Sequence, residues 1–159
     1  MNAQDILKYG HLTVLQTVEG LPEPEWEIGG VCGRWSTKDL IAHLASFEQV
    51  LVEVLGEFLG ITETPTLAAF RDTGDRFNDE QVALRSRKTA AEALAEYTDL
   101  HERAMALAAQ LPAETFRRPG TIPWYGPEYA LDDLIVYAYY GHKREHSAQI
   151  AVFRDRAAR

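Results

Sequence analysis

The sequence has 159 residues, 46% of them hydrophobic and 25% charged, a composition typical of a folded globular domain and not of a disordered segment. Its net charge of −8 argues against general electrostatic binding to nucleic acid or to anionic membranes. No apolar run is long enough to span a bilayer, the first ten residues lack a signal-like apolar core, and the single cysteine, Cys32, fits a reducing compartment, so we expect a cytoplasmic protein.

The first half of the chain predicts two long helices, because its apolar residues recur at helical spacing. Asn2 is a candidate N-cap for a helix that ends near residue 20. A stretch rich in proline and glycine then interrupts the pattern. Ser36 begins the second helix, since its hydroxyl can accept from the amide of Asp39, and this helix runs to about residue 59.

The second half predicts two more long helices. Thr89 and Glu92 have the spacing of a capping box and start a helix that runs to about residue 111. After a second proline-rich stretch, a fourth helix is expected over about 131–156, with acidic residues in its first turn. No segment shows the alternation typical of a strand.

The connection between the second and third helices sets the expected topology. It spans about 29 residues, with a short helix expected near 79–87, and a connection of that length favours a crossover between parallel helices. The sequence therefore predicts an all-α fold: one domain over 1–159, a four-helix bundle in up-down-down-up order with a long crossover between helices two and three.

Three histidines are the strongest candidate site. His142 and His146 are four residues apart on the fourth helix, so their side chains share a face. In the predicted topology, His43 on the second helix lies about 9 Å from one end of the bundle and His146 about 15 Å from the same end. A pair of histidines alone is more often part of an ordinary core. Three at similar depth favour an open metal site, because three protein ligands leave a position for water or substrate.

Two further residues could serve this site. His11 lies on the apolar face of the first helix, and could either line the pocket or be an ordinary core histidine. Glu145 lies between the two helix-four histidines, close to the expected inward face. Its carboxylate could orient an imidazole or act as a base, or could form an interhelical ion pair.

Two motifs, WSTKDLIAHL at 35–44 and HKREHSAQI at 142–150, resemble the DinB/YfiT-like superfamily. The resemblance covers nearly the whole chain and implies the same four-helix, up-down-down-up bundle. It maps the family's metal ligands onto His43, His142 and His146, and Gln149 also matches the family pattern. Members of the family include thiol-dependent S-transferases and isomerases that use bacillithiol or mycothiol. The resemblance thus implies a divalent metal ion, such as zinc, nickel or iron, and a low-molecular-weight thiol.

Two functions remain open at this point. The first is a metal-dependent transferase or hydrolase that acts on a small-molecule substrate. The second is a non-catalytic metal- or small-molecule-binding stress-response protein, which could form a homodimer. No feature of the sequence names the substrate, and neither function involves nucleic acid or a membrane.

Overall fold

Helices make up the regular structure of residues 2–159, which are the residues that the computed structural model describes, and no strand occurs among them. This confirms the predicted all-α class. The helices in chain order are α1 (Ala3–Val18), the 3-10 helix η1 (Glu23–Glu27), α2 (Thr37–Phe58), α3 (Pro65–Thr73), α4 (Arg76–Leu84), α5 (Ala90–Ala108), α6 (Ala113–Arg117), α7 (Leu131–Leu134), the π-helical segment η2 (Ile135–Gly141) and α8 (His142–Ala157).

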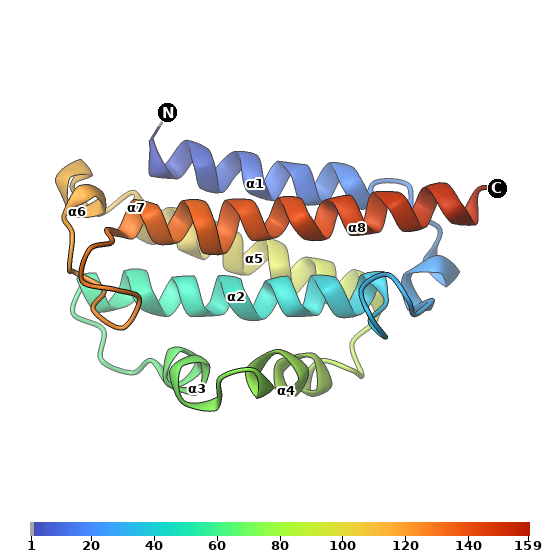
Figure 1. The fold of residues 1–159 in the computed structure, drawn as a ribbon, viewed down its shortest axis with the longest axis horizontal. Coiled ribbons are helices and arrows are strands. Elements are labelled where there is room, and N and C mark those ends of the chain that lie inside the picture. Colours follow the sequence, from blue (N-terminus) through green and yellow to red (C-terminus); the bar gives the residue numbers. More distant parts are fainter. Residues whose placement is uncertain (1) are drawn as a thin grey trace.

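The long helices lie side by side, and their directions can be followed in Figure 1. α1 runs from left to right, as does the continuous stretch formed by α7, η2 and α8, whereas α2 and α5 run from right to left. α3 and α4 lie along the outer side of α2 and connect it to α5. α2 packs mainly against α5, and α1 packs mainly against η2 and α8.

Three of the helix starts follow from local capping. Asn2, Ser36 and Thr89 each accept a hydrogen bond from the amide three residues later, and the acidic residue at that position accepts from the cap amide in return. These capping boxes satisfy amides that a helix start otherwise leaves without a partner. The predicted N-terminal boundaries of these helices are therefore confirmed. Ala130 has no side-chain cap, but its amide donates to the Asp133 carboxylate at 2.8 Å.

The crossover differs from the sequence prediction in having two helices, α3 and α4, where one was expected near 79–87. Few residues anchor these helices to the rest of the protein. Leu67 is the buried residue of α3, and Phe77 and Val82 are those of α4. The Leu67 amide also donates to the buried Glu53 carboxylate of α2 at 2.7 Å. The apolar residues of α3 form one short run and do not recur over several turns, so its pattern is too weak to identify the helix from sequence.

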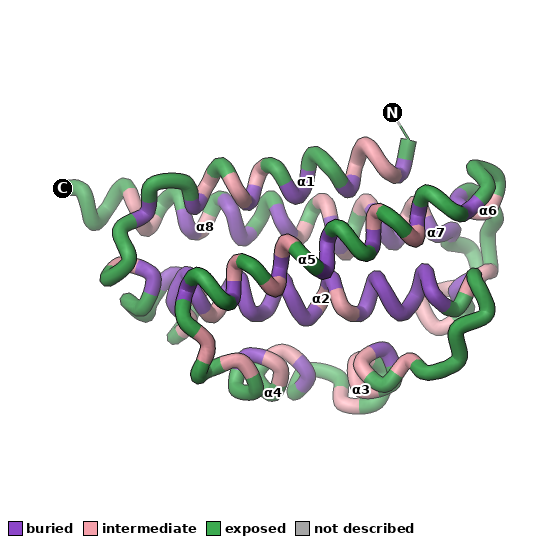
Figure 2. The backbone as a smooth tube through the Cα atoms, turned by 180° about the vertical axis from the view of Figure 1, so that it is seen from behind, coloured by how far each residue is buried: buried purple, intermediate pink, exposed green. Residues whose placement is uncertain are grey.

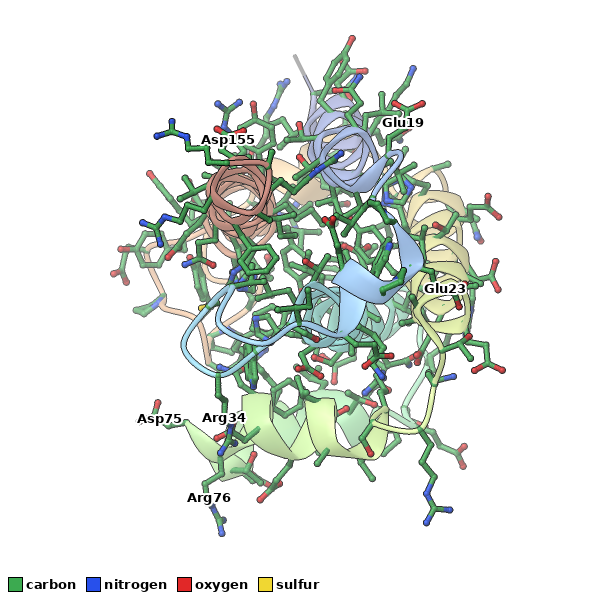
Figure 3. All side chains as sticks on the ribbon, turned by 90° about the vertical axis from the view of Figure 1, so that its right-hand side faces the viewer. Glu19, Glu23, Arg34, Asp75, Arg76 and Asp155 are labelled. Carbon is green, nitrogen blue, oxygen red and sulfur yellow. The ribbon has the colours of Figure 1, made fainter. Side chains whose placement is uncertain are left out.

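Because α3 and α4 cover its outer side, α2 is buried along most of its length, as Figure 2 shows. Charged side chains such as Glu19, Arg76 and Asp155 point away from the bundle in the view along its axis (Figure 3). Within residues 2–159, no helix has both the length and the apolar character needed to cross a bilayer.

The π-helical segment η2 was not expected from the sequence. It runs without a break from α7 into α8, so that His142 is the first residue after it. A π turn takes up more residues than an α turn, and so it rotates everything that follows relative to a regular helix. The direction in which the histidines of α8 point is thus set partly by η2.

Candidate metal centre

The side chains of His43, His142 and His146 meet between α2 and α8. The Nε2 atom of His142 lies 2.9 Å from Nε2 of His43 and 2.8 Å from Nε2 of His146. The nitrogen atoms that the three residues offer as ligands all lie within 4.8 Å of one another. His43 and His146 are buried, and His142 is half-buried.

Their positions follow from the helices that carry them. The capping box at Ser36 fixes the start of α2, and His43 lies in its second turn. His142 and His146 are one turn apart at the start of α8, which runs antiparallel to α2. A helical spacing of four residues places their rings one above the other, both toward His43.

Hydrogen bonds on the outer side of two rings determine what the inner side offers. The Nδ1 atom of His146 lies 2.8 Å from Oε1 of Gln149, so the ring donates from Nδ1 and keeps a lone pair on Nε2. The ring of His142 is held on its other side by a hydrogen bond to the backbone of Ala138. The Nε2 lone pair of His146 therefore faces Nε2 of His142 at 2.8 Å, an approach for which either an Nε2–H of His142 or a cation between the two atoms accounts.

The environment makes a proton a poor candidate for that cation. Burial first, and then the neighbouring His142 and His146, lower the pKa of His43 to about 2. Burial and the neighbouring His146 also lower the pKa of His142 to about 4, although the hydrogen bond to Ala138 opposes this shift. The neutral imidazole is the form that binds a metal ion. The donor set is therefore suited to a divalent metal ion.

Aromatic side chains surround the three histidines. The ring of Trp35 lies 5.0 Å from the ring of His43, and the ring of Phe47 lies 4.9 Å from that of His43 and 4.5 Å from that of His142. Phe77 packs behind Phe47, with 6.2 Å between the ring centres. These rings restrict the access of water to the site and leave His142 as its most exposed member.

The two other sequence candidates lie apart from the three histidines. The ring of His11 stacks on that of His101 at 3.8 Å, in a different part of the core. Glu145 is exposed, so the expected inward placement of this residue is wrong. Neighbouring residues of a helix point about 100° apart, so Glu145 faces solvent when His146 faces the core.

Sequence reasoning missed a second buried polar cluster. Glu48 is fully buried, forms an ion pair with Lys143 and lies 3.7 Å from Nδ1 of His101. The ammonium group of Lys143 also lies 5.6 Å from the centre of the Tyr97 ring. A signal for this cluster was present, because Glu48 interrupts an apolar stripe four residues after Leu44.

The model of the DinB superfamily matches residues 11–150 of the chain. The matched part extends from α1 into α8 and includes all three histidines of the site. Comparisons with curated proteins and with solved structures found no match.

Proposed function

We propose that this chain, which belongs to the DinB superfamily, binds one divalent metal ion through the Nε2 atoms of His43, His142 and His146. The observation that carries the proposal is the approach of the three Nε2 atoms, with the Nε2 lone pair of His146 turned toward His142. Three imidazole ligands suit zinc, nickel or iron. Gln149 keeps the imidazole of His146 in the tautomer that leaves Nε2 free.

We also interpret the four long helices as the up-down-down-up bundle of the family, with α3 and α4 in the crossover. The directions of the helices in Figure 1 support this interpretation. In this topology α2 and α8 are antiparallel, and that relation lets one residue of α2 meet two residues of α8.

The reaction that we propose for this site is a metal-dependent transfer or hydrolysis on a small-molecule substrate, with a low-molecular-weight thiol as the nucleophile in a transfer. A divalent ion held by three protein ligands has an open position and lowers the pKa of a water or thiol bound there. The chain itself would hold the ion with its imidazoles, orient one of them through Gln149 and limit water with Trp35 and Phe47.

Metal content can be tested on protein purified without a histidine tag. We expect about one divalent ion per chain, and a large loss of affinity in His43→Ala and in His142→Ala. His11→Gln is the matched control, because it removes a buried imidazole that lies outside the site and should leave the stoichiometry unchanged. Equal metal content in wild type and in a His43→Ala/His142→Ala double variant would contradict the proposal.

The open position can be tested with cobalt. Addition of a small thiol to the cobalt-loaded protein should produce a thiolate-to-cobalt charge-transfer band, which His142→Ala should lack. A spectrum that does not respond to thiol, together with a large drop in melting temperature on chelation, would leave the ion structural. It would also favour the non-catalytic alternative.

A further inference from the structure

The bundle is built from two pairs of helices, and the backbone of one pair approaches that of the other closely at few positions. α2 packs along α5, and α1 packs along η2 and α8, whereas α2 and α8 approach closely at few positions. Yet the three histidines of the metal centre are divided between α2 and α8. The register of one helix pair against the other therefore decides whether the three Nε2 atoms meet.

The second buried polar cluster crosses the same boundary. Glu48 comes from α2 and Lys143 from α8, and the two side chains form an ion pair in which Glu48 is fully buried and Lys143 is 2% exposed. His101 from α5 lies beside the same carboxylate, and His11 from α1 stacks on His101. All four long helices thus contribute to one cluster.

The ion pair is a directional contact. Burial raises the pKa of Glu48, but Lys143 and His101 lower it by more, so the carboxylate stays charged. Within residues 2–159, Lys143 has no charged side-chain partner other than Glu48, and His101 is the other polar side chain beside the carboxylate of Glu48. A buried charge without its partner is strongly unfavourable, so any arrangement that separates α8 from α2 at this point is disfavoured.

The positions of the two residues connect the ion pair to the metal centre. Lys143 directly follows His142, and neighbouring residues of a helix point about 100° apart. When Lys143 points at Glu48, the rotation of α8 is fixed, and His142 then points at His43. Glu48 follows His43 by five residues, which is about 7.5 Å along α2. Together with the packing of Phe47 on His142, the ion pair and the histidines hold the rotation and the height of α8 on α2, directly after the irregular segment η2.

We propose that Glu48 and Lys143 are a positioning pair for the metal centre: their ion pair sets the register of α8 on α2 in which His43 meets His142 and His146. The inference rests on the proposed function for its consequence, which is metal affinity. The placement of the three imidazoles by the ion pair does not depend on the metal. Because the bound form requires this register, loss of the pair should lower affinity by reducing the fraction of molecules in it.

The test replaces the pair by apolar residues of similar size, in Glu48→Leu/Lys143→Met. Such replacements of buried ion pairs often leave a protein folded and as stable. We expect the affinity for cobalt to fall about 10- to 100-fold, as for other residues that orient metal ligands, and the ligand-field spectrum to change. The matched control is Arg85→Met/Glu96→Leu, which removes an ion pair between the residue directly after α4 and a residue of α5, and this pair does not join the two helix pairs. Its cobalt affinity should equal that of wild type.

A second readout uses the metal-free protein, in which nitrogen NMR signals of the histidine rings report the contact between His43 and His142. These signals should shift in Glu48→Leu/Lys143→Met and stay unchanged in the control. Wild-type cobalt affinity and unchanged ring signals in the folded double variant would overturn the inference. If wild type binds no metal and the ring signals still shift, the positioning role stands and the proposed function fails. Should the double variant not fold, Lys143→Met alone repeats both measurements, because Glu48 can then take up a proton and remain buried.

Discussion

Acid should destabilise the metal-free protein well above the pH at which carboxylates titrate. Burial lowers the pKa of three histidines from 6.5, to about 3 for His11, about 2 for His43 and about 4 for His142. Below pH 6.5 the unfolded chain binds a proton on each of these imidazoles, whereas the folded protein keeps them neutral. The unfolded state then binds more protons, so the free energy of unfolding falls as the pH falls.

The size of the effect follows from these values. Between pH 8 and pH 5, each of the three histidines should lower the free energy of unfolding by about 2 kcal/mol, so that the total is about 6 kcal/mol. This total is a large part of the free energy of unfolding of a typical domain, which is about 5–15 kcal/mol. Glu48, whose pKa is lowered, adds a further loss only when the pH falls below about 4.5, so the window from pH 5 to 8 isolates the histidines.

Urea unfolding of chelator-treated protein, followed by circular dichroism at several pH values, measures this dependence. His11→Gln should reduce the difference between pH 8 and pH 5 by about 2 kcal/mol, because one of the three imidazoles is gone. A difference of less than about 2 kcal/mol in wild type would refute the reasoning. It would mean that the buried rings are as easily protonated as exposed ones.

Three further changes have expected outcomes. Glu48→Gln leaves the ammonium group of Lys143 buried without a counter-charge, and urea unfolding should show a loss of about 3–5 kcal/mol, whereas a loss below about 1 kcal/mol would show that the pair is not needed for folding. Gln149→Leu removes the acceptor for an imidazole N–H, so calorimetric titration should show metal affinity lower by about 10- to 100-fold, and an unchanged affinity would exclude this role. Glu53→Gln weakens the charge-assisted hydrogen bond to the Leu67 amide, so the amides of α3 should exchange hydrogen faster, with a loss of about 1–2 kcal/mol, and equal exchange rates would refute the anchor.

The parts of the fold that were predictable are those that neighbouring residues determine. The caps at Asn2, Ser36 and Thr89 act over three residues, and the long amphipathic helices repeat their pattern over several turns. The pairing of His142 with His146 is equally local. To predict that this pair meets His43, only the relative direction of two helices was needed. The length of the crossover suggested that α2 and α8 are antiparallel, and the helix directions in Figure 1 agree with this.

The parts that were not predictable depend on contacts between distant segments. The π-helical segment η2 lies in a stretch whose sequence is compatible with a regular helix, and its packing against α1 is a tertiary contact. The ion pair between Glu48 and Lys143 joins residues 95 positions apart, so sequence can show that each is out of place in an apolar stripe but not that they meet. His11 was assigned to the right face of its helix, yet its partner is His101.

His43 should lower the stability of the metal-free protein and raise the stability of the metal-bound protein. This residue is 2% exposed, and its Nδ1 atom has no hydrogen-bond partner among residues 2–159. A buried polar atom without a partner costs about 1–3 kcal/mol, so His43→Leu, which is similar in size and apolar, should make the chelated protein as stable as wild type or more so.

With metal the order should reverse. An ion at about 1,000 times its dissociation constant stabilises the protein that binds it by about 4 kcal/mol, and His43→Leu should gain little of this. The measurement is the melting temperature of wild type and of His43→Leu, each with chelator and with excess zinc. The difference between the two proteins is then compared between the two conditions. If His43→Leu melts lower than wild type by the same amount in both conditions, His43 serves packing, and the three histidines are not held together for an ion.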